Sequence, residues 1–248
     1  MKKLLLIISI CTVGYSQCLG DLNEDGTKNI LDILILVSDI LAGDDQCEDF
    51  TDVCVDIDGN IYQTIQIGNQ LWMSENLKTT HYNDGSEIPT GLNNSAWTNT
   101  TEGAYTYYND DPSHLETYGN LYNWYAVDEG DLCMEGWHVP SDDEWTVLTD
   151  YLGGSSVAGG KMKEEGLDHW NSPNTGATNE SGFTGLPAGY RGSSNGSYTD
   201  TGNYGYFWSS SEYGSYDAWY RGLYYNDSNV SRSLSSKQNG FSIQIGRA

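Results

Sequence analysis

The sequence has 248 residues, including 35 Asp or Glu and 11 Lys or Arg, so its formal net charge at pH 7 is −24. Such an acidic surface repels nucleic acid and anionic lipid, which excludes both as expected partners. With 29 Gly, 19 Tyr and 8 Trp, the composition is typical of a loop-rich β or α+β domain rather than a helical bundle.

The N-terminus has the pattern of a secretory signal peptide. Lys2 and Lys3 precede an apolar run from Leu4 to Val13, and the small residues Gly14 and Ser16 stand before Gln17. We expect cleavage after residue 16, which removes two lysines and takes the charge from −24 to −26. A lipoprotein is disfavoured, because Gln17 stands where a lipid-attachment site needs a small residue. No later apolar run approaches about 18 residues, so we expect a secreted or cell-surface bacterial protein without a transmembrane segment.

The cysteines of the mature chain are an even set, namely Cys18, Cys47, Cys54 and Cys133. An exported protein with four cysteines is expected to form two disulfides, and sequence leaves three pairings open. Of these we favour Cys18 with Cys47 and Cys54 with Cys133. Their spacing does not match a zinc site.

Residues 17–47 contain a candidate calcium loop followed by an apolar helix. Oxygen ligands recur at loop positions one, three and five, Gly26 permits the sharp turn, and a carboxylate closes the loop at position twelve. The predicted calcium ligands are Asp21, Asn23, Asp25, Thr27 and Asp32. The segment resembles one calcium-binding repeat of a dockerin, which implies a cohesin-like or scaffold partner. A dockerin has two repeats, so we favour a lone calcium-stabilised spacer over a working docking module.

Residues 48–54 are expected to link this repeat to a larger domain at 55–248. A turn at 56–60 leads into a strand over 61–67, where apolar residues alternate, and a second strand follows over 71–73. Farther along, we expect a surface loop over 87–101, a strand over 105–108 and a helix over 118–127.

A short helix is predicted after Pro140. Ser141 and Glu144 form a capping box, acidic residues occupy the first turn, and Trp145 and Leu148 share one face. After a loop over 171–182, alternation predicts strands over 204–210, 218–225, 230–234 and 241–245.

Eight stretches together resemble the Fibrobacter succinogenes major paralogous domain. They are Asp58 to Tyr62, Ile67 to Leu77, Tyr118 to Trp124, Cys133 to Trp145, Gly159 to Lys163, Gly182 to Arg191, Phe207 to Glu212 and Gly240 to Ser242. The segment from Trp137 to Trp145 and the closing Gly-Phe-Ser are also similar to formylglycine-generating-enzyme domains.

This resemblance implies an α+β, C-type-lectin-like domain of twisted antiparallel strands, with a few short helices and long loops. The family usually ends in Gly-Phe-Ser-x-x-Cys, but here Ile245 stands at the cysteine position. The resemblance therefore implies that Cys133 needs another disulfide partner, and Cys54 is the available replacement.

We expect no enzymatic activity and assign no catalytic residues. The histidines are His81, His114, His138 and His169, and no serine lies in a Gly-x-Ser-x-Gly elbow with an obvious set of catalytic partners. His138 is better explained as a structural group beside Pro140, and Asp142 and Asp143 as helix-capping charges.

A binding function is better supported, because residues 198–237 are rich in tyrosine among small polar residues. The predicted ligand face is Tyr213, Tyr216, Tyr225, Asn226, Asp227, Asn229, Ser231 and Arg232. Two functions remain: a recognition or adhesion module for an extracellular glycan or protein, and a structural surface protein attached to a larger assembly through the calcium repeat. The same composition also permits a diversified variable segment.

Overall fold

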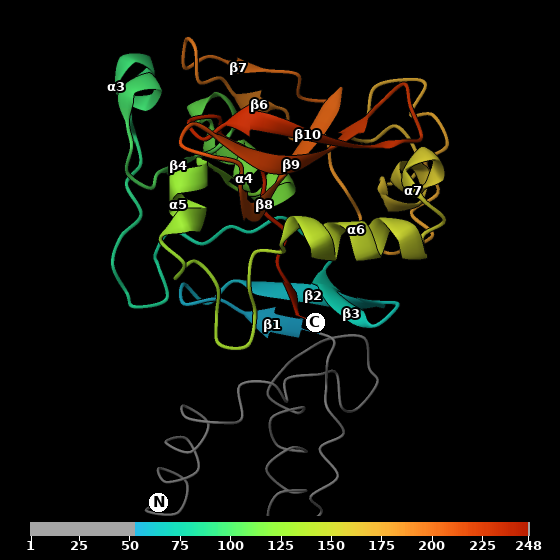
Figure 1. Ribbon diagram of the computed structural model, residues 1–248. Helices are drawn as coiled ribbons and strands as arrows, with labels where there is room; N and C mark the ends of the chain where they lie inside the picture. The colour runs from blue at the N-terminus through green and yellow to red at the C-terminus, as the bar shows by residue number, and fades with distance from the viewer. Residues whose placement is uncertain (1–52, 248) are drawn as a thin grey trace, which may run out of the picture.

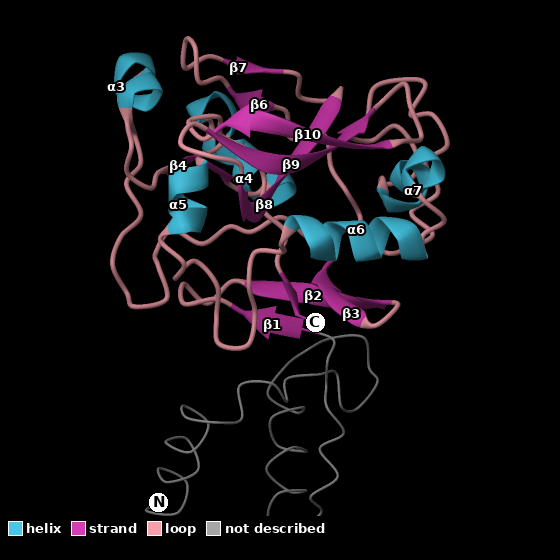
Figure 2. Cartoon of the chain, in the orientation of Figure 1, coloured by secondary structure: helices cyan, strands magenta, loops and turns pink. Residues whose placement is uncertain are grey.

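The computed structural model describes residues 53–247, which form a mostly β domain with a few short helices (Figures 1 and 2). The strands are β1 (Val53–Val55), β2 (Ile61–Ile67), β3 (Gln70–Met73), β4 (Tyr105–Thr106), β5 (Leu121–Tyr122), β6 (Tyr190–Arg191), β7 (Tyr198–Thr199), β8 (Tyr204–Glu212), β9 (Asp217–Tyr224), β10 (Val230–Ser236) and β11 (Gly246–Arg247). The helices are α3 (Asn94–Asn99), η1 (Tyr108–Asp110), η2 (Pro112–His114), α4 (Leu115–Tyr118), α5 (Trp124–Asp128), α6 (Asp142–Tyr151) and α7 (Ser155–Met162).

Two antiparallel sheets enclose helix α6. One sheet has the order β1-β2-β3-β11, so the last strand of the chain pairs with one of the first. The other has the order β10-β9-β8. In Figure 1, α6 lies between them, and β6 and β7 lie beyond the second sheet. The two ends of the described chain therefore meet in one sheet.

The predicted capping box begins α6 and is confirmed. The Ser141 side chain accepts from the backbone N–H of Glu144, whose carboxylate accepts from the backbone N–H of Ser141. Trp145, on the buried face of this helix, lies 4.9 Å from Trp72 of β3 and 6.0 Å from Phe207 of β8, between ring centroids. One amphipathic helix thus joins the two sheets through aromatic contacts.

The start of α6 is also fixed by charge. The carboxylate of Asp142 accepts from Arg221 of β9 at 2.6 Å and from Arg232 of β10 at 2.7 Å. Burial alone would raise the pKa of Asp142, but the hydrogen bonds from Arg232 and Arg221 outweigh it and lower that pKa. Asp142 therefore remains charged and holds the helix against the sheet.

The sequence predicts the main strands well and several connections poorly. The strand over 61–67 is confirmed as β2, and those over 204–210, 218–225 and 230–234 are confirmed with small shifts as β8, β9 and β10. The predicted loop over 87–101 is wrong in part, because it contains α3, whose Trp97 is fully buried. The strand predicted over 105–108 ends at Thr106.

The helix predicted over 118–127 is wrong in its first half. Gly119 has a positive φ of 68°, and the buried Asn120 side chain donates to the carbonyls of Lys78 and Thr79. These bonds hold the chain extended, and helix α5 begins only after Asn123, whose side chain caps it. The strand predicted over 241–245 is replaced by single bridges, such as Tyr122 with Phe241, before β11.

The structure does not contain the predicted disulfide between Cys54 and Cys133. The first described strand, β1, begins at Val53, within the predicted linker of residues 48–54, and the predicted domain boundaries stay a prediction. Cys54 and Cys133 are both free thiols, so the disulfide predicted between them is not formed in the structure. Burial and the proximity of Cys54 raise the pKa of Cys133 to about 12, which disfavours the reactive thiolate. Cys18 and Cys47 lie outside the described residues, as do the predicted signal peptide and calcium loop.

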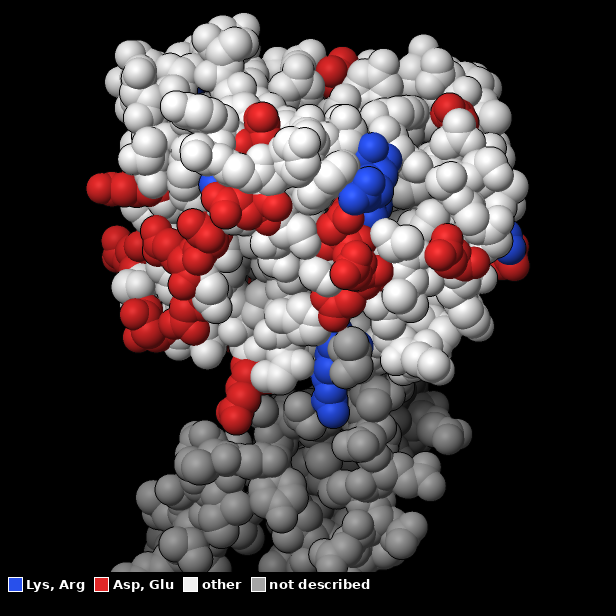
Figure 3. Space-filling model, viewed as in Figure 1, with Lys and Arg blue, Asp and Glu red and all other residues white. Residues whose placement is uncertain are grey.

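No helix in the described part of the chain is long and apolar enough to cross a bilayer. On the face shown in Figure 3, acidic side chains form several patches, whereas basic side chains appear in few places.

Candidate functional site

One face of sheet β8–β9–β10 carries tyrosines and serines in register. Tyr204 lies opposite Tyr224, and Trp208 lies opposite Tyr220. On the other side of β9, Ser231 pairs with Gly222, Ser233 with Tyr220 and Ser235 with Ala218. Side chains of directly paired residues point to the same face. We call this the tyrosine–serine face; its members are Tyr190, Tyr204, Tyr206, Tyr220, Tyr224, Ser231, Ser233 and Ser235, all half-buried.

Contacts between rings hold these tyrosines in place. Tyr206 lies at the centre: its ring is 5.4 Å from Tyr190, 5.6 Å from Tyr220 and 5.8 Å from Tyr204, measured between centroids. It also stacks on the buried Phe241 at 5.0 Å. Because the rings fix one another, this surface is rigid before any ligand binds, which lowers the entropic cost of binding.

The hydroxyls of Tyr206 and Tyr220 remain protonated. Burial, followed by the nearby Tyr224, raises the pKa of Tyr220 to about 12, and the same two causes raise that of Tyr206 further. The Tyr220 hydroxyl hydrogen bonds with Ser233 and Tyr224. The face therefore presents neutral hydroxyls that can donate and accept hydrogen bonds, rather than phenolate nucleophiles.

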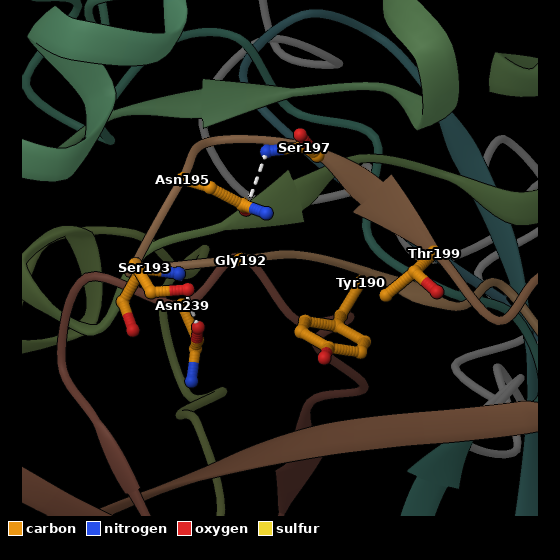
Figure 4. Close-up of a pocket in the computed structure, with 8 residues that line it drawn as sticks. Tyr190, Gly192, Ser193, Asn195, Ser197, Thr199 and Asn239 are labelled. Carbon is orange, nitrogen blue, oxygen red and sulfur yellow. Dashed lines mark hydrogen bonds between the residues drawn. The ribbon is translucent and has the colours of Figure 1, made fainter.

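A cavity of about 340 Å³ adjoins this face (Figure 4). In Figure 4, Tyr190 and Thr199 lie on one side of it, and Ser193 and Asn239 on the other. Asn239 accepts from the backbone N–H of Ser193 at 2.6 Å and donates to Ser235 of the tyrosine–serine face at 2.6 Å. The cavity and the face thus share Tyr190 and a hydrogen-bonded border. Its lining of hydroxyls, amides and one aromatic ring suits a polar, uncharged ligand.

The structure divides the ligand face that the sequence predicts. Tyr213 and Tyr216 are exposed in the turn between β8 and β9, and the Tyr225–Asn229 turn lies at the opposite end of β9. An eight-residue strand spans about 25 Å, so these groups cannot contact one small ligand together. Arg232 lies on the opposite face of the sheet, against the Trp219 ring at 3.7 Å.

Two of the predicted residues do lie at the observed site. Ser231 belongs to the tyrosine–serine face, and the Tyr225 ring lies 6.4 Å from that of Tyr204. The turn residues Asp227 and Asn229 hydrogen bond to each other at 2.8 Å. The buried Lys163 ammonium donates to the Asp227 carbonyl at 2.8 Å, which gives this turn a structural role.

Sequence reasoning missed these site residues: Tyr190, Tyr204, Tyr206, Tyr220, Tyr224, Ser233, Ser235 and Asn239. Most of these residues could have been found from their spacing. Tyr204 and Tyr206 are two residues apart, as are Ser231, Ser233 and Ser235, and alternate residues of a strand lie on the same face of the sheet. The positions of Tyr190 and Asn239 depend on the tertiary fold and leave no local signal.

Each histidine of the described chain has a hydrogen-bonded neighbour. His81 contacts Asp58 at 2.5 Å, His138 contacts Glu144 at 2.6 Å, and His169 contacts Glu164 at 2.8 Å. His114 contacts the Tyr108 carbonyl at 2.9 Å. No group of three His, Cys, Asp or Glu side chains within residues 53–247 could hold a metal ion. The predicted calcium ligands lie outside this range and stay a prediction.

Comparison with known proteins identifies a family but no characterised relative. A family model described as the Fibrobacter succinogenes major domain matches residues 65–245. No curated protein and no solved structure matches the chain.

Proposed function

The chain belongs to the Fibrobacter succinogenes major domain family, and on that premise we propose that it is a secreted or cell-surface recognition module that binds a glycan. The observation that carries this proposal is the rigid tyrosine–serine face with the polar cavity beside it. Aromatic rings pack against the apolar faces of sugars, and neighbouring hydroxyls and amides form hydrogen bonds with the hydroxyl groups of the sugar. A binding role therefore fits both halves of the site.

We propose that this role is non-catalytic. Carboxylates and a backbone carbonyl engage the described histidines, and burial raises the pKa of Cys54 and Cys133 to about 12. The pKa values of Tyr206 and Tyr220 are raised for the same reason. The buried thiols and tyrosine hydroxyls stay protonated, which makes them poor nucleophiles.

We also propose a C-type-lectin-like class for the domain. Its support is the pairing of β11 with β3, which joins the two ends of the described domain, and the second sheet of three antiparallel strands. For residues 17–47 we propose calcium binding through Asp21, Asn23, Asp25, Thr27 and Asp32, because their hard oxygens recur at the loop positions that calcium requires. A calorimetric titration of the mature chain with calcium tests the proposed calcium site, and Asp25→Ala should abolish the binding heat.

A glycan array tests the main proposal with two double variants, one at the site and one control. Tyr206→Phe with Tyr224→Phe removes two hydroxyls from the face and keeps the rings, so the fold should be preserved. Each lost hydrogen bond is worth about 0.5–1.5 kcal/mol, so we expect affinity to fall about 10-fold or more. The control, Tyr213→Ala with Tyr216→Ala, removes exposed rings at the turn between β8 and β9 and should leave binding unchanged. Loss of binding in the control alone would refute this site.

A further inference from the structure

The β6–β7 hairpin separates two cavities. Tyr190 pairs with Thr199, and Arg191 pairs with Tyr198. Because successive side chains in a strand point to opposite faces, Tyr190 and Thr199 face the cavity described above, and Arg191 and Tyr198 face the other way. On that second side lies another cavity of about 360 Å³, whose lining includes Tyr105, Tyr107 and Asp110.

A carboxylate is fixed at the edge of this second cavity. Oδ1 of Asp110 accepts from the Tyr198 hydroxyl at 2.6 Å and from the Thr106 hydroxyl at 2.9 Å. The two hydroxyls are themselves 2.7 Å apart. Asn109 and Asp110 both have a positive φ, of 59° and 52°, which is uncommon for residues other than glycine. The surrounding contacts therefore hold the carboxylate in a position that the local backbone does not favour.

The negative charge of Asp110 has no positive partner. Within residues 53–247, no Lys, Arg or His forms an ion pair with it. Arg191 lies across the Tyr198 ring at 5.0 Å, but its Nε and Nη2 donate to the carbonyls of Gly196 and Leu92. Neutral hydroxyls alone hold the carboxylate, so its charge is available to a ligand.

We propose that this second cavity binds a hydroxylated organic amine, the chemistry of an amino sugar. Asp110 would pair with the ammonium group, and the rings of Tyr105 and Tyr107 supply the electron-rich faces that cations prefer. Asn93 and Thr90, which also line the cavity, offer an amide and a hydroxyl for the ligand's hydroxyl groups. The net charge of −24 attracts cations toward the protein. This site is independent of the tyrosine–serine face.

Calorimetric titration of the full chain with glucosamine and with glucose at pH 6, where the amine is protonated, tests the proposal. A hydrogen bond to a charged group is worth about 1.5–3 kcal/mol, so glucosamine should bind about 10- to 100-fold more tightly than glucose. Asp110→Asn should abolish this preference. Asp128→Asn, which makes the same charge change at the exposed end of α5, should retain it.

Three results would overturn the proposal: equal affinity for the two sugars, no binding of glucosamine, or an undiminished preference in Asp110→Asn. If Asp110→Asn does not fold, the NMR signals of Tyr105 and Tyr107 in the unaltered chain decide, because glucosamine must shift them. The same spectra separate the two sites, because glucosamine in this cavity shifts Tyr105 and Tyr107, whereas a sugar on the tyrosine–serine face shifts Tyr206 and Tyr220. Shifts at Tyr206 and Tyr220 alone would overturn this proposal and leave the proposed function standing.

Discussion

At the scale of single residues, buried charged side chains join segments that are distant in sequence. The side chain of Lys163 is fully buried, and its ammonium donates to the carbonyls of Thr175, Tyr224 and Asp227 at 2.8–3.0 Å. Burial lowers the pKa of Lys163 to about 8, so the group is still charged at pH 7. One lysine thus anchors the loop before Phe183 and the turn after β9.

Replacing Lys163 should destabilise the domain far more than replacing its neighbour Lys161. Lys163→Met removes three hydrogen bonds from a charged donor, and we expect the free energy of unfolding to fall by about 3 kcal/mol or more. Lys161 makes only a surface contact with Glu180 at 3.4 Å, so Lys161→Met should cost under about 1 kcal/mol. Urea denaturation at pH 7 measures both values, and similar losses in the two variants would contradict this role for Lys163.

Asp142 should make part of the stability depend on acid pH. Removing one member of a buried ion pair costs about 3–5 kcal/mol, which we expect for Asp142→Ala because Arg221 would stay buried. The pKa of Asp142 is lower in the folded chain than in the unfolded chain, where it is about 3.9. Its contribution is therefore fully present above about pH 4 and is lost as the pH falls through the folded pKa.

Denaturation of wild type and Asp142→Ala over a pH series measures this dependence. The difference between their unfolding free energies should be constant above about pH 4 and should shrink below it. Asp143 is exposed, so Asp143→Ala should stay within about 0.5 kcal/mol of wild type throughout. A difference between wild type and Asp142→Ala that persists unchanged in strong acid would contradict the assignment.

At the scale of elements, α7 packs tightly through its glycines. A Cβ added to Gly160 would lie 2.3 Å from the carbonyl oxygen of Gly176, and the Gly160 N–H donates to the Ser228 carbonyl at 3.0 Å. Helix α7 therefore lies against two loops with no room for a methyl group.

Gly160→Ala should destabilise the domain, although the same change in an exposed helix usually stabilises it by about 0.4–1 kcal/mol. Overpacking costs about 1–3 kcal/mol, which exceeds that gain. Ser156→Ala, at an exposed position of the same helix, should be neutral or slightly stabilising. Thermal unfolding compares the two variants, and a higher melting temperature for Gly160→Ala would show that the contact can relax.

Elements with local signals could be predicted from sequence, and elements set by distant contacts could not. The capping box of Ser141 and Glu144, a signal contained in four consecutive residues, marks the start of α6. Alternation of apolar residues along 61–67 identifies β2. The segment over 118–127 has mixed spacing, and its conformation depends on bonds from Asn120 to the carbonyls of Lys78 and Thr79. Those partners lie about 40 residues away, where no local pattern reports them.

At the scale of the whole molecule, the fold gathers a binding surface from separate parts of the chain. The sequence predicted a tyrosine-rich ligand face in the right region, and two of its residues, Tyr225 and Ser231, lie at or beside the observed face. It grouped both ends of β9 together, although the strand predicted over 218–225 already separates them. Tyr190 and Asn239 join the site only through the packing of the β6–β7 hairpin beside the sheet.

The most direct test of the account is to locate a bound glycan. Once an array has identified a binding glycan, NMR titration of the labelled chain maps the residues whose signals shift. The account predicts that the largest shifts fall on Tyr190, Tyr206, Tyr220 and Asn239, around the tyrosine–serine face and its cavity. Shifts confined to Tyr213 and Tyr216, or spread without focus over the surface, would contradict it.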